Sequence, residues 1–201
     1  MPARLAVFIS GSGRSMINLL DRSGDGRLDA EVAVVVASKP CKGADLARER
    51  GVDVLIPDHP LTDAWLVELV RQRSIDLIIL AGYIRHLPIP AELEGRILNI
   101  HPGLLPGDGT PGRFGGKGMH GAHVHRAVIE AGEPESGCTV HRVTNEYDAG
   151  PVILRKTCPV LPDDTPESLA ARVFDLELEA YPEAIAKVIA PDAAVRTDRP
   201  A

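Results

Sequence analysis

The sequence predicts an α/β fold, in which helices cover both faces of a mostly parallel β-sheet. Through the first half of the 201-residue chain, short apolar runs alternate with helical patterns, which is the rhythm of parallel sheets. The run at 31–37 is rich in valine, as expected for a strand buried on both faces. We expect one domain at 1–190, followed by a loose, charged tail at 191–201.

Local patterns predict each element in turn. Apolar runs bounded by turn residues predict strands at 5–9, 31–37, 52–56, 76–81, 96–100, 138–143 and 152–158. Helical spacing predicts helices from 16, at 43–50, from 62, at 122–131 and from 165. Thr62 and Thr165 can cap helix starts, Pro166 suits a first helical position, and Gly51 can close the second helix. Eight glycines and three prolines at 102–121 predict a long loop.

The bulk composition argues against several classes of protein. The net charge is −6 and the chain has no basic run, so nucleic-acid or membrane-surface binding is not expected. The apolar run at 5–9 is too short for a signal peptide, and no stretch has membrane-spanning length. Cys41, Cys138 and Cys158 are far apart and form no CxxC pair, which is typical of reduced thiols. We therefore expect a cytoplasmic protein.

The glycine-rich turn after the first strand, Ser10-Gly11-Ser12-Gly13-Arg14-Ser15, leads directly into a helix. Amides at a helix start can bind phosphate, and glycines let the phosphate come close. A dinucleotide fingerprint would need a third glycine where Met16 stands and an acid near Lys39. The turn therefore predicts a phosphate site and not a nicotinamide site, although a tight turn without any ligand fits the same residues.

Two further segments carry polar groups suited to catalysis. Asn99 and His101 lie two residues apart at the end of the fifth strand, so they share a face at the edge where open α/β sheets bind ligands. An amide beside an imidazole can stabilise an oxyanion and move a proton. Asp148, in a later loop, would raise the pKa of a nearby histidine and keep it cationic. From spacing alone, Asn99 and His101 fit a polar strand end equally well, and Asp148 by itself is better explained by a turn with Gly150.

These motifs resemble the signature of the folate-dependent formyltransferases. The resemblance rests on Asn99-Ile100-His101-Pro102, Leu104-Leu105-Pro106 and Asp148-Ala149-Gly150-Pro151, and it extends from Leu5 to about Ile189. The family's fold is a Rossmann-like, mostly parallel twisted sheet with antiparallel C-terminal strands. The Ser-Gly-x-Gly turn makes the chain most similar to members that formylate glycinamide ribonucleotide in de novo purine (IMP) synthesis.

The resemblance implies a role for each motif residue. Asn99, His101 and Asp148 would be the catalytic triad, with 10-formyltetrahydrofolate as co-substrate and no metal. The ribonucleotide, mainly its phosphate, would contact Gly11, Ser12, Gly13, Arg14, Ser15 and Glu177. The folate pocket would comprise Ile84, Arg85, His86, Leu87, Asn99, Val143, Thr144, Asn145, Glu146, Tyr147 and Asp148. The substrate amine would attack the formyl carbon, and Asn99 with a cationic His101 would stabilise the oxyanion.

The chain departs from the family pattern at three places. Gly103 stands where many members have serine, and Arg14-Ser15 stand where many have Ser-Asn. The glycine-rich loop is longer than in most relatives, and its residues 108–113 look additional. The sequence therefore leaves the conformation of this loop and the contacts of Arg14 open.

Four alternatives remain beside this interpretation. Formyltetrahydrofolate deformylase shares the triad but gives the formyl group to water, and its relatives have an extra N-terminal domain. Methionyl-tRNA formyltransferase has an additional C-terminal domain and a basic surface for RNA. A metal-dependent hydrolase could use His120, His123, His125 and His141, but His123 and His125 cannot face one ion from a helix. A catalytically silent binding module would share the fold. The expected partners are small molecules, and a homodimer is one of the assemblies left open.

Overall fold

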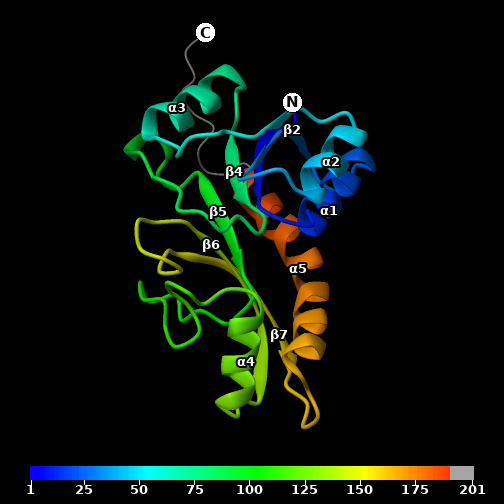
Figure 1. Cartoon of the computed structure of the whole chain (residues 1–201), viewed down its shortest axis with the longest axis vertical. Coiled ribbons are helices and arrows are strands. Elements are labelled where there is room, and N and C mark those ends of the chain that lie inside the picture. Colours follow the sequence, from blue (N-terminus) through cyan, green and yellow to red (C-terminus); the bar gives the residue numbers. More distant parts are fainter. Residues whose placement is uncertain (191–201) are drawn as a thin grey trace.

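A seven-stranded sheet forms the centre of the computed structural model, which describes residues 1–190 (Figure 1). The tail expected at 191–201 lies outside the described residues. The strands are β1 (Ala3–Ile9), β2 (Ala30–Ala37), β3 (Val54–Leu55), β4 (Leu77–Leu80), β5 (Ile97–His101), β6 (Glu135–Arg142) and β7 (Val152–Pro159). Their order across the sheet is β3-β2-β1-β4-β5-β6-β7.

The sheet is mixed, as the resemblance implies. Strands β1 to β5 run parallel to one another, whereas β6 is antiparallel to β5 and β7 is antiparallel to β6. The strand predicted at 52–56 is shorter than expected, because the Val52 amide instead bonds the carbonyl of Ala47 at the end of the preceding helix. The chain adds β2 and then β3 on one side of β1, and it then crosses over to add β4 on the other side of β1. Open α/β sheets bind their ligands at such a switch point.

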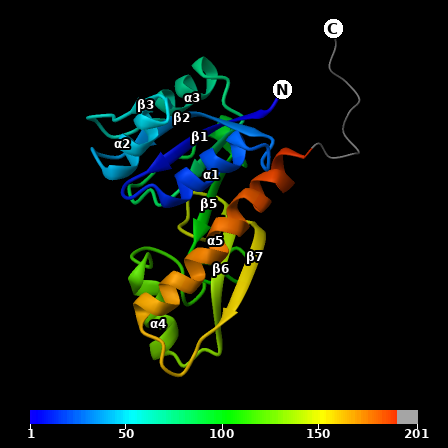
Figure 2. The ribbon, with the colours of Figure 1, turned by 90° about the vertical axis from the view of Figure 1, so that its right-hand side faces the viewer.

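Helices cover both faces of the sheet, but unequally (Figures 1 and 2). They are α1 (Arg14–Gly24), α2 (Lys42–Glu49), α3 (Asp63–Gln72), α4 (Ala122–Glu130) and α5 (Pro166–Ile189), with a short 3-10 turn, η1 (Ala91–Leu93). Apolar side chains of α1, α2, α4 and α5 share one core with the sheet, and those of α3 and η1 pack on its other face. Within residues 1–190, no helix is both long and apolar enough to cross a membrane.

The predicted helix starts are confirmed by their hydrogen bonds. The hydroxyl of Thr62 accepts from the amide of Trp65 at 3.2 Å. Thr165 and Ser168 form a reciprocal capping box at the start of α5, directly before Pro166 at its first position. The buried hydroxyl of Tyr181 donates to the carbonyl oxygens of β4 and β5, so α5 is fastened across the strand ends that carry the candidate site.

Candidate active site

A large cavity, of about 850 Å³, opens at the carboxyl ends of β1, β4 and β5. Its walls are completed by α5, by the loop 143–148 and by part of the glycine-rich loop. Every residue that the sequence places in the catalytic, ribonucleotide or folate sets lines this cavity. The structure therefore brings together segments as far apart in the chain as Gly11 and Glu177.

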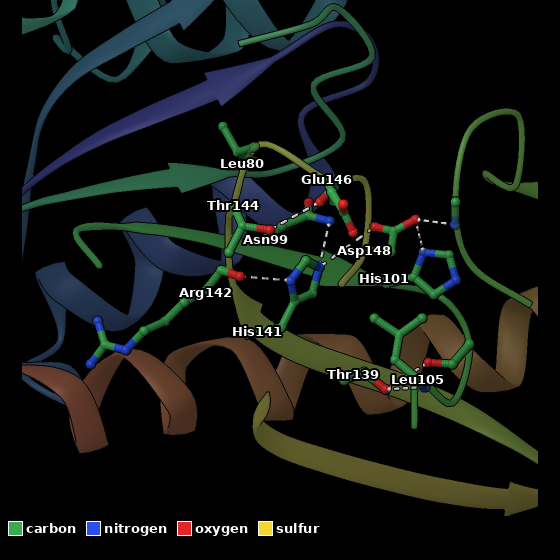
Figure 3. A network of polar contacts seen from close by, with 12 residues as sticks. Leu80, Asn99, His101, Leu105, Thr139, His141, Arg142, Thr144, Glu146 and Asp148 are labelled. Carbon is green, nitrogen blue, oxygen red and sulfur yellow. Dashed lines mark hydrogen bonds and ion pairs between the residues drawn. The ribbon is translucent and has the colours of Figure 1, made fainter. Parts of the chain in front are cut away.

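The carboxylate of Asp148 lies between two histidine rings (Figure 3). Its Oδ2 is 3.5 Å from Nδ1 of His101, and its Oδ1 is 3.6 Å from Nε2 of His141. The amide of Gly116 donates to the same Oδ2 at 3.0 Å. The backbone of Asp148 has φ 56, in the left-handed region that aspartate tolerates better than most residues. This turn directs the carboxylate into the cavity and not along the loop.

His141 is a site residue that the sequence considered only as a metal ligand. Its Nδ1 lies 3.0 Å from the carbonyl oxygen of Arg142, which can only accept, so Nδ1 carries the hydrogen. Nε2 of the neutral ring can then accept from the amide nitrogen of Asn99 at 3.2 Å. The contact exists because Asn99 pairs with His141 across the antiparallel strands β5 and β6. The sequence carries no signal for that register, so motif reasoning missed the residue.

The charge state expected for His101 is corrected by the structure. The side chain is only 3% exposed, and burial lowers its pKa more than Asp148 and the Phe114 carbonyl raise it. The net result is a pKa below the usual histidine value, so the ring is neutral in the free site at neutral pH. Burial would raise the pKa of Asp148, but contacts with His141, His101 and the Gly116 amide lower it below its usual value. The pair therefore combines a neutral imidazole with a carboxylate.

The start of α1 forms one end of the cavity. Its N-cap residue, Gly13, has φ 74, and a Cβ there would lie 2.7 Å from the backbone of Gly43. Only glycine allows this approach, and it has no side chain to cap the first-turn amides, which can therefore bind an anion. The Arg14 guanidinium stacks on the Phe174 ring at 3.7 Å. Burial raises the pKa of nearby Glu177 to about 7, although the charge of Arg14 opposes that rise.

A second region of the cavity, called its apolar end below, carries exposed apolar side chains. Ile84 and Tyr147 are the large hydrophobic residues that line it while remaining 69% and 49% exposed. The rings of His86 and Tyr147 meet edge to face, with centroids 6.2 Å apart. The buried hydroxyl of Ser10 accepts from the Ile84 amide at 3.1 Å, which ties this end to the turn before α1. The cavity thus joins an anion-binding end to an end suited to a flat ring.

The other histidines do not form a metal centre. Within the described part of the chain, no group of three or more His, Cys, Asp or Glu side chains is arranged to hold a metal ion. His120 and His123 pack against each other edge to face, while His125 is buried. His125 lines the cavity, and its Nδ1 has no hydrogen-bond partner. The sequence treated it only as part of the metal alternative.

Comparisons with known proteins agree with this geometry. The model of the formyl transferase family matches residues 3–185. A chloroplastic phosphoribosylglycinamide formyltransferase of Arabidopsis thaliana is 38% identical in an alignment of 195 residues that covers 92% of this chain and 65% of that protein. The chain thus spans slightly less than two thirds of that relative's length.

Solved structures give the same picture. Glycinamide ribonucleotide transformylase 1 from Symbiobacterium toebii is 39% identical, with a TM-score of 0.80 over 92% of this chain and 86% of that one. A formyltetrahydrofolate deformylase from Pseudomonas syringae is 22% identical, with a TM-score of 0.77 over 92% of this chain and 61% of that one, and this likeness concerns the fold alone. Because the family match covers nearly all described residues and the motif residues meet in one cavity, this chain belongs to the formyl transferase family.

Proposed function

We propose that this chain transfers the formyl group of 10-formyltetrahydrofolate to the amine of 5-phosphoribosylglycinamide, in de novo purine synthesis. The products are the N-formyl ribonucleotide and tetrahydrofolate. The observation that carries the proposal is that Asn99, His101 and Asp148 line the same cavity as the start of α1 and the exposed side chains of the cavity's apolar end. The names of the similar plant and bacterial proteins support the choice of substrates.

The acceptor binds with its phosphate against the start of α1. The first-turn amides after Gly13 supply donors, and the Arg14 guanidinium supplies a positive charge held in place by Phe174. Glu177 follows on the same wall of the cavity, one helical turn before the buried Tyr181. A carboxyl group there can accept hydrogen bonds from the acceptor's hydroxyl or amine groups.

The folate binds at the end lined by Ile84, His86 and Tyr147. Their exposed apolar surfaces suit a planar ring system, since stacking and edge contacts with aromatic groups favour such ligands. Loop 143–148 completes this end and carries Asp148 to the centre of the cavity. The formyl group of the donor then lies near Asn99 and His101.

The reaction moves a formyl group in one direction and a proton in the other. The neutral amine attacks the formyl carbon, and the resulting oxyanion is stabilised by the amide of Asn99. His101, neutral in the free site, accepts the proton that the amine loses, and Asp148 stabilises the cation that forms. The carbon–nitrogen bond to the folate then breaks, and its nitrogen receives that proton. His141 donates to a backbone carbonyl through Nδ1 and thereby holds Asn99 in place.

A folate turnover assay tests the proposal. Purified protein is mixed with 10-formyltetrahydrofolate alone, with glycinamide ribonucleotide, or with the corresponding ribonucleoside that lacks the phosphate. Turnover that requires the ribonucleotide, and that is much weaker with the ribonucleoside, is expected. Equal turnover without any acceptor would instead identify a deformylase. No turnover in any mixture would contradict formyl transfer to this acceptor.

A further inference from the structure

The glycine-rich loop reaches both members of the His101–Asp148 pair. The carbonyl oxygen of Phe114 lies 2.6 Å from Nε2 of His101, and the amide of Gly116 donates to Oδ2 of Asp148 at 3.0 Å. Two backbone groups, separated by one residue, therefore contact both partners. The Phe114 carbonyl contacts the ring nitrogen that points away from Asp148, and the Gly116 amide contacts the same Oδ2 that lies 3.5 Å from Nδ1 of His101.

The Phe114 contact determines which ring nitrogen of His101 carries the hydrogen. The Phe114 carbonyl and the Asp148 carboxylate both only accept, and the shorter contact, 2.6 Å against 3.5 Å, assigns the single hydrogen of the neutral ring to Nε2. Nδ1 is then left with a lone pair facing Asp148. A proton that arrives at His101 can settle only on Nδ1, between the ring and the carboxylate. Without the Phe114 carbonyl, the two neutral tautomers would compete. For part of the time Nδ1 would then carry the hydrogen and could not accept a proton.

Gly115, between the two contacts, explains why the loop can approach so closely. A Cβ at this position would lie 2.7 Å from Cδ2 of Leu105 and 3.2 Å from Cβ of Asp148, and it would also collide with the carbonyl oxygen of Pro111. Any side chain at Gly115 must therefore displace the backbone between the two contacts, or the neighbours that it meets. The requirement is for the absence of a side chain, because this glycine does not have a positive φ.

The loop is also anchored where it leaves β5. The buried hydroxyl of Thr139 donates to the carbonyl of Gly103 at 2.7 Å and accepts from the amide of Leu105 at 3.1 Å. Arg155 of β7 donates to the carbonyls of Leu105 and Pro106. These contacts fix the start of the loop on β6 and β7, so the segment 114–116 returns to the site from a defined base.

We infer that residues 114–116 are a positioning segment for catalysis: they fix the tautomer of His101 and the direction of the Asp148 carboxylate through the carbonyl of Phe114 and the amide of Gly116. The inference rests on the proposed function, because it concerns the same proton transfer. It assigns a catalytic purpose to a stretch of the loop whose role the sequence left open.

The test compares two glycine variants of the same loop. Gly115→Ala places a methyl group against Asp148, whereas Gly109→Ala introduces a side chain at φ 89, where a Cβ meets nothing within 4 Å. The control therefore strains the loop backbone without touching the pair. We expect Gly115→Ala to lower kcat by about 10²-fold, the usual effect of displacing a catalytic group by about 1 Å. Its KM values should stay within about twofold of the wild-type values, and Gly109→Ala should keep wild-type kcat.

A second readout does not depend on turnover. In ¹⁵N-edited NMR of the wild-type protein, the ring Nε2–H of His101 should give a low-field resonance in slow exchange, assigned by its loss in His101→Gln. Gly115→Ala should lose this resonance, and Gly109→Ala should retain it. Thermal unfolding checks that both variants are folded.

Several results would overturn the inference. The first is that the wild-type protein shows no protected Nε2–H resonance. The second is that a folded Gly115→Ala variant has a kcat within about threefold of the wild-type value. The third is that both glycine variants lose kcat equally. If Gly115→Ala does not fold, the wild-type resonance decides the question. If the wild-type protein shows the resonance but no formyl transfer, the proposed function fails while the tautomer assignment stands.

Discussion

Glu177 offers a quantitative test of the electrostatics of the cavity. Burial raises the pKa of its carboxyl group from 4.5 to about 7, with Arg14 opposing the rise. Between these two values the native protein holds a proton that the unfolded chain has released. The free energy of unfolding therefore falls as the pH rises from about 4.5 to about 7, and the loss is complete above the native pKa. Glu177→Gln removes the ionisation and keeps the shape of the side chain.

The size of the effect follows from the shift. Each unit of pKa corresponds to about 1.4 kcal/mol, so the ionised carboxyl destabilises the native protein by about 3 kcal/mol at alkaline pH. Glu177→Gln should match the wild type in stability near pH 4, below the unfolded pKa, and exceed it by up to that amount near pH 8.5. For a domain of this size, the gain corresponds to a rise in Tm of roughly 6–12 °C.

The assay is thermal unfolding of ligand-free protein, followed by circular dichroism across this pH range. Asp175→Asn is the matched control, because it removes an exposed carboxylate from the same helix. Its Tm difference from the wild type should stay small and nearly constant with pH. The reasoning is refuted if the Tm difference for Glu177→Gln is the same at both ends of the range, or if the variant is less stable at alkaline pH.

Three further substitutions test separate parts of the molecule. Asn99→Ala removes an oxyanion donor and should lower kcat by about 10²–10³-fold in the folate assay, with KM values nearly unchanged; an unchanged kcat would contradict that role. Arg14→Ala should raise KM for glycinamide ribonucleotide by about tenfold, the equivalent of about 1.4 kcal/mol, without changing KM for the ribonucleoside; an equal rise for both would exclude a phosphate contact. Thr165→Ala should cost about 1 kcal/mol of stability in urea unfolding through loss of the helix cap, and an unchanged midpoint would show that the cap is dispensable.

The sequence predicts most of the fold because the signals for its elements are local. Valine-rich runs, the caps at Thr62 and Thr165, and the alternation of strands and helices all act over a few residues. The prediction was wrong in length at the third strand, where a helix-closing hydrogen bond from Val52 competes with strand pairing. That competition depends on how α2 ends, which apolar periodicity does not describe.

The candidate site was only partly predictable for a related reason. Motif residues such as Asn99 and Asp148 can be recognised from the sequence alone, whatever their position in the fold. His141 and the segment 114–116 enter the site through strand register and through the close approach of a glycine, and neither is encoded in local spacing. The pKa of His101 depends on burial by residues from several segments, which the sequence does not show. The expectation of a cation therefore took account of the charge of Asp148, which raises this pKa, but not of burial, which lowers it.

A neutral His101 can serve formyl transfer as a proton acceptor. Catalysis requires interactions that strengthen on the way to the transition state, and the charge that His101 would gain in the proposed reaction is one of them. In the proposed reaction, the histidine gains its charge when the attacking amine loses a proton, as the oxyanion beside Asn99 forms. Asp148, whose pKa is lowered by its contacts with His141, His101 and the Gly116 amide despite burial, is charged beforehand to stabilise that cation. The burial that keeps His101 neutral at rest thus also makes its interaction with the oxyanion specific to the reaction.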